Sequence, residues 1–270
     1  MNKLLLIIFL AILLFSCKEK NSTQINPTED DTEINIDSIF LMKALEDAMS
    51  KIALVKDRDF YLNKYKVNVE CQEHIARDVD VEVVYGNLFS DKHKHLYVKR
   101  IPSWGSSSIL DIYLAKNDRF EMLFSQEFVL EYIGDTIRDV NGDGLKDLDV
   151  WWYPSSGCCR RNVHDIYLSD AETGRLSDKY EFINPTFYPK EKIIRGVGYG
   201  YEGVLYKYKW NGTVVDTIEY IWQYADYEKP ELKPQYFRIS AKGDTVKIPA
   251  IPKEYLTVDD IDWLSAVLEK

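Results

Sequence analysis

Nine residues in the middle of the chain, from Asp139 to Asp147, place oxygen-bearing groups at alternate positions along a turn that contains glycine. A calcium-binding loop takes side-chain oxygens from positions one, three and five, a backbone carbonyl from position seven and a further ligand from position nine. Here these positions hold Asp139, Asn141, Asp143, Leu145 and Asp147, the last binding directly or through water. Hard oxygen ligands favour calcium over zinc or copper. The spacing therefore predicts bound calcium with a structural role. The alternative is a solvated turn built from ordinary turn residues.

Two further residues define the type of loop. Gly144 stands at position six, where the chain must turn sharply and a residue without Cβ does so at least cost. Val150 stands at position twelve, where an EF-hand has a bidentate glutamate. The aromatic and β-favouring run that follows, Leu148 to Tyr153, predicts a strand and not the second helix of an EF-hand.

The amino terminus resembles a bacterial lipoprotein signal. Lys3 gives a positive start, Leu4 to Phe15 form an apolar run too short to span a bilayer comfortably, and Ser16 precedes Cys17. The resemblance implies a signal peptide over residues 1–16, cleavage before Cys17 and acylation of Cys17, which would anchor the protein in a membrane. By the same resemblance, Lys18 favours the outer membrane. The acidic residues that follow leave both a periplasmic and a surface-facing orientation open.

Composition indicates how the chain is organised and which classes of partner its charge favours. Residues 17–34 are polar and predict a flexible tether, and the remaining chain, 35–270, is long enough for one domain with a sizeable core. The formal net charge of −10 argues against nucleic acid as a partner and is compatible with a basic protein.

Three cysteines remain after Cys17. They are Cys71, Cys158 and Cys159, an odd number in a compartment that permits disulfides. We expect one disulfide, either between Cys71 and one of the neighbouring pair or between Cys158 and Cys159. The alternative is that all three are reduced.

The order of local patterns predicts a mainly β domain, antiparallel and either propeller-like or a simple meander, with one N-terminal and one C-terminal helix. Apolar residues recur at helical spacing over 36–53 and again over 257–268. Between them lie short alternating runs broken by turn residues. A weak repeat of strand, tight turn and strand begins at Asp111, Asp165 and Tyr206, a period that suits propeller blades.

Motifs for catalysis are missing from the sequence. There is no Gly-x-Ser-x-Gly elbow, no His-Glu-x-x-His zinc helix and no phosphate-cradling glycine loop. His93 and His95 lie in a lysine-rich turn, where we expect them to be solvated and not metal ligands. We therefore predict that the protein is not an enzyme.

The segment from Asp139 to Trp222 resembles secreted calcium-binding proteins related to the FG-GAP and VCBS propeller repeats. The shared features are the 139–147 loop, the 165–168 strand with its 172–176 turn, and the hairpin at 208–212. Some members of this group look like immunity proteins or inhibitors of lysozyme-like effectors. The resemblance implies a binding or inhibitor module for such an envelope-acting, wall-degrading enzyme, whose basic charge this acidic chain would complement. The alternative is a surface glycan-binding or adhesion lipoprotein that uses exposed aromatics, with four candidates: Trp104, Trp151, Trp152 and Tyr153.

Overall fold

The fold comes from a computed structural model that divides into two compact units, residues 1–36 and 37–270. The residues described are 36–70, 76–105, 107–117, 119–129, 132–154, 161–198, 204–224, 228, 234–259 and 261, so the second unit is described by itself. Cys17, Cys71, Cys158 and Cys159 lie outside these residues, and the lipid anchor and the disulfide stay predictions. Within the described part, no helix is long and apolar enough to cross a membrane.

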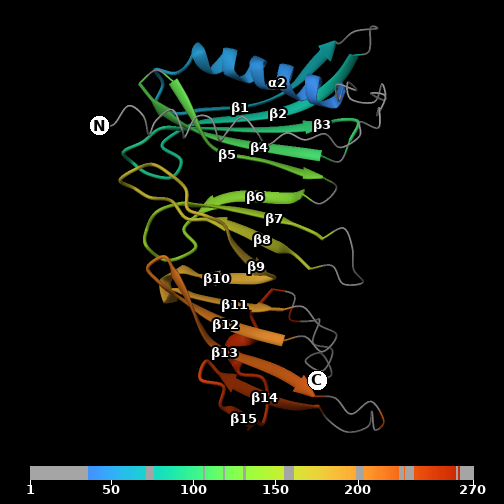
Figure 1. The fold of residues 1–270 in the computed structure, drawn as a ribbon, viewed down its shortest axis with the longest axis vertical. Helices are drawn as coiled ribbons and strands as arrows, with labels where there is room; N and C mark the ends of the chain where they lie inside the picture. Colours follow the sequence, from blue (N-terminus) through green and yellow to red (C-terminus); the bar gives the residue numbers. More distant parts are fainter. Residues whose placement is uncertain are drawn as a thin grey trace, which may run out of the picture. The chain divides into compact units, whose positions relative to one another are not determined.

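Antiparallel strands make up most of the second unit and form three sheets among the described residues (Figure 1). The first sheet contains β1 (Tyr61–Glu70), β2 (Ala76–Gly86), β3 (His95–Pro102), β4 (Ser107–Lys116) and β5 (Arg119–Val129). The second contains β6 (Tyr132–Arg138), β7 (Asp147–Trp152), β8 (Val163–Tyr167) and β9 (Tyr180–Ile183). The third contains β10 (Pro185–Tyr188), β11 (Ile193–Val197), β12 (Val204–Asn211), β13 (Val214–Tyr224), β14 (Gln235–Ser240) and β15 (Thr245–Ile248). Strands lie in chain order within each sheet, so the predicted mainly β, antiparallel fold is confirmed in its meander form.

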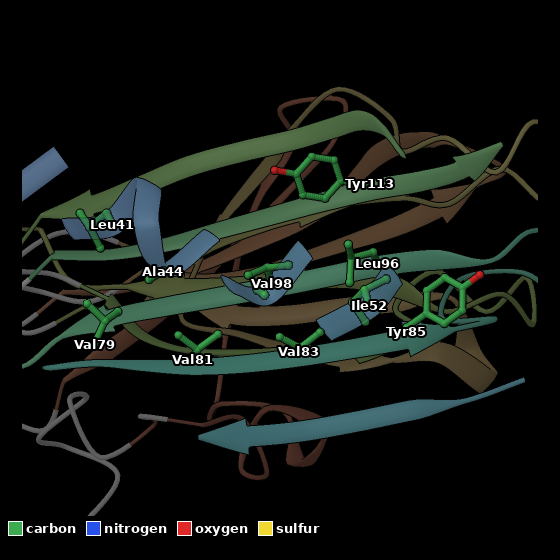
Figure 2. Packing of buried hydrophobic residues seen from close by; sticks show 11 residues of the cluster. Leu41, Ala44, Ile52, Val79, Val81, Val83, Tyr85, Leu96, Val98 and Tyr113 are labelled. Atoms are coloured by element: carbon green, nitrogen blue, oxygen red, sulfur yellow. The ribbon is translucent and has the colours of Figure 1, made fainter. Parts of the chain in front are cut away.

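The predicted N-terminal helix is confirmed with its predicted bounds, as α2 (Ile36–Ala53). Its apolar stripe, including Leu41, Ala44 and Ile52, packs on one face of the first sheet (Figure 2). That face carries Val79, Val81 and Val83, because alternate residues of a strand point to the same side. Burial of this stripe therefore holds the helix to the sheet.

A buried ion pair of the first sheet also contacts α2 through its arginine. Arg100 of β3 pairs with Asp111 of β4, and its guanidinium also donates to the backbone carbonyl of Leu41 at 2.7 Å. The Arg100 and Asp111 side chains are 5% and 1% exposed. Since a buried charge needs a partner, Asp111 balances the Arg100 charge, and the hydrogen bond to Leu41 connects this pair to the helix.

Two further apolar clusters connect neighbouring sheets. Leu110 and Ile112 of the first sheet pack with Leu148 and Val150 of the second. The opposite face of the second sheet contributes Ile166 and Phe182, which pack with Ile194 and Trp210 of the third. The second sheet thus packs on apolar side chains at both of its faces.

Of the three predicted hairpins, two are confirmed and one differs. β4–β5 turns at Asn117, with φ 49°, and β12–β13 turns at Gly212, with φ 63°. The middle segment is β8 followed by a loop that returns through one bridge between Ser169 and Leu176. Each of the three segments belongs to a different sheet.

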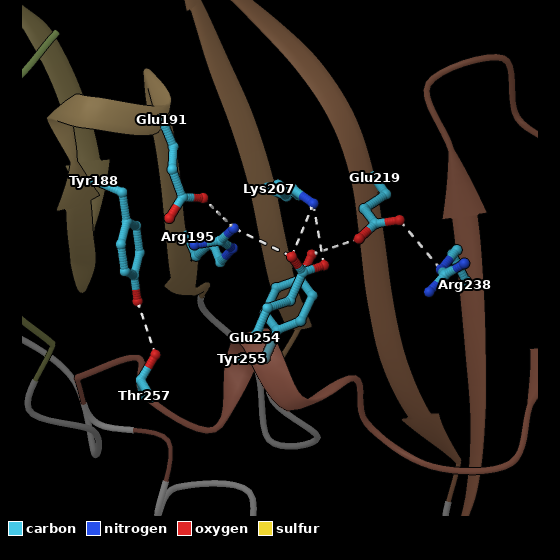
Figure 3. A network of polar contacts seen from close by, with 9 residues as sticks. All are labelled: Tyr188, Glu191, Arg195, Lys207, Glu219, Arg238, Glu254, Tyr255 and Thr257. Carbon is cyan, nitrogen blue, oxygen red and sulfur yellow. Dashed lines mark hydrogen bonds and ion pairs between the residues drawn. The ribbon is translucent and has the colours of Figure 1, made fainter. Parts of the chain in front are cut away.

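A C-terminal segment covers the outer face of the third sheet. The helical turn η4 (Lys253–Tyr255) places Glu254 between Arg195 and Lys207, at 3.1 and 3.0 Å (Figure 3). The hydroxyl of Thr257, predicted to begin the last helix, lies 3.1 Å from that of Tyr188. Most of that helix lies outside the described residues, so it stays a prediction.

Candidate functional site

The predicted calcium loop connects β6 to β7 and is shaped by two glycines. Gly142 has φ 76° and Gly144 has φ 89°, values that favour glycine. A Cβ on Gly142 would lie 2.1 Å from the backbone oxygen of Pro189, which begins the helical turn η3 (Pro189–Glu191) after β10. Nothing lies within 4 Å of the corresponding position on Gly144. Gly144 therefore serves the turn itself, whereas Gly142 also permits the loop to approach the third sheet.

The side chains at positions one, three and five accept hydrogen bonds from amides of their own loop. Asp139 accepts from the backbone N–H groups of Gly142 and Gly144, at 2.7 and 3.0 Å. Asn141 accepts from Asp143 N at 3.0 Å, and Asp143 accepts from Leu145 N at 2.8 Å. Each carboxylate oxygen keeps further acceptor capacity, because a carboxylate offers about four lone-pair sites. The loop is therefore ordered by its own polar groups and still presents oxygens.

Asp147, at position nine, is fully buried and joins the loop to the second sheet. One carboxylate oxygen accepts from Val140 N and the other from Ser169 N, both at 3.0 Å. Burial, together with the charges of Asp143 and Asp139, raises the pKa of the Asp147 carboxyl to about 7, although the two hydrogen bonds lower it. The three carboxylates thus repel one another.

These residues fit calcium in donor chemistry and in charge. Asp139, Asn141, Asp143 and the carbonyl of Leu145 are hard oxygen donors, and a cation would relieve the repulsion among the carboxylates. No three Asp, Glu, His or Cys side chains of the described residues form a group that could hold a metal by themselves. Binding would therefore depend on the Asn141 amide and the Leu145 carbonyl as much as on the carboxylates.

A polar cluster that the sequence analysis did not identify lies just after the loop. Asp149 of β7 is fully buried. One of its carboxylate oxygens accepts a hydrogen bond from the Arg138 guanidinium at 2.6 Å, and the other lies 2.7 Å from Nδ1 of His164. The His164 ring stacks on Trp151, with centroids 5.5 Å apart and planes at 16°. The Arg138 guanidinium lies 5.1 Å from the ring centre of Phe187. This cluster holds β6, β7 and β8 together beside β10.

A sequence signal for this cluster exists. In the strand that follows the loop, a period of two places Asp147, Asp149 and Trp151 on one face and Leu148 and Val150 on the other. Two acids on a buried face require hydrogen-bond or ion-pair partners. Which residues serve as these partners depends on which strands pair.

The histidines differ from the expectation of a solvated pair. His95 is fully buried, lies 2.8 Å from the Gly174 carbonyl through Nε2, and packs edge-on against Phe89. His93 lies 2.9 Å from the Glu172 carbonyl through Nε2. The prediction that both are solvated was wrong, because the 170–175 loop, far along the chain, packs on this turn.

The four aromatic candidates for glycan binding are partly buried. Trp104 packs on Phe40 of α2, with ring centroids 5.2 Å apart, and Trp152 donates from Nε1 to Asp165 at 3.2 Å. Trp151 stacks on His164, as described above. Three of these aromatics thus have packing or hydrogen-bonding roles within the fold.

A different set of aromatics lines a hollow of about 230 Å³ at β9, β12 and β13. Tyr206 and Tyr208 stack there, with ring centroids 4.6 Å apart and planes at 22°, and Phe182 and Tyr220 contribute further rings. The hydroxyls of Tyr208 and Tyr220 lie 3.4 Å apart. Periodicity could have indicated these tyrosines, since Tyr206 and Tyr208 alternate along one strand.

In comparisons with known proteins, no family model matches the chain and no curated protein matches it. A solved structure described as "Structure of a Xanthomonas Type IV Secretion System related protein" is similar to it, at 12% sequence identity and a TM-score of 0.34. That similarity covers 72% of this chain and 100% of the other.

Proposed function

We propose that the protein is a membrane-anchored calcium-binding lipoprotein that acts as a binding or inhibitor module toward a lysozyme-like, envelope-acting protein. The observation that carries the proposal is the 139–147 loop. Its side chains at positions one, three and five turn into the loop, and its buried Asp147 is hydrogen-bonded to the second sheet.

Calcium would have a structural role in this function. Held by Asp139, Asn141, Asp143 and the Leu145 carbonyl, and by Asp147 directly or through water, it would neutralise the carboxylates and stiffen the connection between β6 and β7. Because Gly142 packs on Pro189, a stiffer loop would also limit movement of the second sheet against the start of the third. A rigid surface loses less entropy when a partner binds.

The partner is proposed from charge. A chain of net charge −10 attracts a basic enzyme, and opposite charge speeds association. The test uses the full-length chain in a nonionic detergent and measures peptidoglycan digestion by a panel of lysozyme-type enzymes. We expect slower digestion that recovers as salt is added, since salt screens charge-steered encounter.

The calcium and partner proposals can be separated in the same assay. Asp143→Asn should weaken inhibition at a limiting calcium concentration, whereas Asp244→Asn, an equal charge change in the exposed β14–β15 turn, should not. Full enzyme activity at micromolar excess of the protein across the panel would refute the inhibitor proposal and leave calcium binding to be judged by itself.

Glycan binding is the second candidate, and the stacked tyrosines of the β12–β13 hollow favour it. Sugar rings pack on aromatic faces, and the paired hydroxyls of Tyr208 and Tyr220 offer hydrogen bonds. On a glycan array, Tyr208→Ala should then lose retention, whereas Tyr224→Ala, at an exposed tyrosine on the same strand as Tyr220, should retain it. Equal retention by both variants would contradict a site in this hollow.

A further inference from the structure

Basic side chains of this acidic protein gather around one hollow at the end of the first sheet. The hollow has a volume of about 330 Å³ and is bordered by three segments: the chain after α2, the turn before β3 and the β4–β5 turn. Its lining includes five cationic side chains and one carboxylate, that of Asp57. The cations are Lys56, Lys92, Lys94, Lys116 and Arg119. This local excess of positive charge opposes the net charge of −10 of the whole chain.

The base of the hollow is aromatic and fixed. Tyr85 and Phe120 line it with ring centroids 6.2 Å apart and planes at 86°, and both pack against the α2 core. The ammonium of Lys94 lies 5.7 Å from the centre of the Tyr85 ring. A ligand that enters here therefore meets both exposed cationic side chains and the more buried rings of Tyr85 and Phe120.

The lysine-rich turn is held in place by the 170–175 loop, which follows β8, and by β4 of its own sheet. His93 and His95 lie within hydrogen-bond distance of the Glu172 and Gly174 carbonyls, and the Ala115 amide donates to the Lys94 carbonyl at 2.9 Å. A Cβ on Gly174, which has φ 68°, would lie 2.7 Å from Cγ of His93. This close packing orders the cationic rim before any ligand arrives, which lowers the entropic cost of binding.

The cations differ in how far they are already neutralised. Lys92 pairs with Glu172, and Lys94 lies 3.4 Å from a carboxylate oxygen of Asp59. Lys116 and Arg119 have no carboxylate partner among the described residues, and they stand directly opposite each other on β4 and β5. Like charges directly opposite on neighbouring strands are destabilising, so an anion between them would relieve repulsion.

Lys116 is central to this surface. Besides the hollow described above, it lines two adjoining hollows of about 480 and 340 Å³. Lys116 is therefore a lining residue that the three hollows share.

We propose that this hollow binds a phosphate monoester, carried either by a small soluble molecule or by a lipid headgroup, with Lys116 and Arg119 as the principal contacts. A phosphate monoester carries nearly two negative charges and three strong acceptor oxygens. These match two cations for which the described part of the chain provides no carboxylate partner. The arginine fork suits two of those oxygens and the lysine acts as a point charge. Tyr85 and Phe120 would face the group that carries the phosphate.

The test is calorimetric titration of the full-length chain, in nonionic detergent and at low ionic strength, with probes that share one ring. Glucose 6-phosphate should bind, glucuronate should bind more weakly and glucose should not bind. A second arm compares dihexanoyl phosphatidic acid with dihexanoyl phosphatidylcholine, which lacks the monoester. Binding in the first arm assigns a soluble phosphorylated ligand, and binding of phosphatidic acid alone assigns a headgroup.

Matched variants tie binding to the two residues. Lys116→Gln and Arg119→Gln should each weaken binding of the phosphate probe about tenfold or more, as expected for loss of a charge-assisted hydrogen bond. Lys242→Gln, the same charge change at an exposed turn of the third sheet, should leave binding unchanged. Without probe, Lys116→Gln should melt at or above the wild-type temperature, because a repulsion is removed.

Three results would overturn the proposal. They are no binding of either phosphate monoester, equal affinity for glucuronate, and equal weakening by Lys242→Gln. The second would assign the hollow to carboxylates, and the third would reduce the effect to diffuse electrostatic attraction.

Discussion

Asp143→Asn tests the calcium loop most directly. Asp143 is exposed, and one of its carboxylate oxygens accepts a hydrogen bond from Leu145 N at 2.8 Å. The other oxygen accepts from Nδ2 of Asn141 at 2.9 Å. Asparagine can keep the acceptor for Leu145 N, while it removes one negative charge and the hydrogen bond from Asn141. In the absence of calcium the variant should therefore stay within about 1 kcal/mol of the wild type, since reduced repulsion with Asp139 and Asp147 offsets the lost hydrogen bond. In calcium it should lose most of the gain in stability.

The size of that gain follows from mass action. For a dissociation constant of ~0.1 mM, within the range for extracellular calcium modules, a hundredfold excess of calcium stabilises the folded state by about 2.7 kcal/mol. For a domain of this size, each kcal/mol shifts the melting temperature by about 2–4 °C, so the wild type should gain roughly 5–11 °C. A site weakened ten- to a hundredfold would keep only about 0.4–1.4 kcal/mol.

Thermal melts of the full-length chain in calcium and in chelator measure this difference. Asp244→Asn is the control, because it removes a charge from another exposed turn and should keep the whole gain. Asp143→Ala separates the two roles of the side chain: it should also lose about 0.5–1.5 kcal/mol in chelator, with the hydrogen bond to Leu145 N. Equal melting of the wild type in calcium and in chelator would refute the reasoning and leave the loop as a turn.

Three other predictions concern the fold and the anchor. Asp111→Ala should cost about 3–5 kcal/mol in denaturant unfolding, because it leaves the buried Arg100 charge without its partner. Arg100→Met combined with Asp111→Leu should recover much of this loss, and a cost below about 1 kcal/mol for Asp111→Ala would contradict it. Burial lowers the pKa of His95, despite the opposing effect of its contact with the Gly174 carbonyl. As pH falls, His95 is therefore protonated more readily in the unfolded chain than in the folded one, which lowers the free energy of unfolding below about pH 6.5. His95→Gln removes this titration and should make stability fall less steeply with decreasing pH. An unchanged pH profile would count against that role for His95. Mass spectrometry of the native protein should find Cys17 acylated at the amino terminus, and an intact Met1 would rule out the anchor.

Local sequence patterns determined several elements correctly. The spacing of apolar residues was sufficient for the bounds of α2, and Asn211-Gly212 was sufficient for the β12–β13 turn. The glycine and aspartate spacing of the 139–147 loop likewise predicted a tight turn that leads into a strand. These features depend on hydrogen bonds and dihedral angles within a few residues, which is the information that a short segment contains.

Contacts between distant segments were decided by the tertiary structure. His95 lies among lysines in sequence, yet it is buried because the loop that contains Gly174 covers it. The basic hollow likewise requires the segment after α2 and two turns of the first sheet to meet. A period of two shows which side chains share a face, but it does not show which face packs on which, because that depends on pairing between strands far apart in the chain.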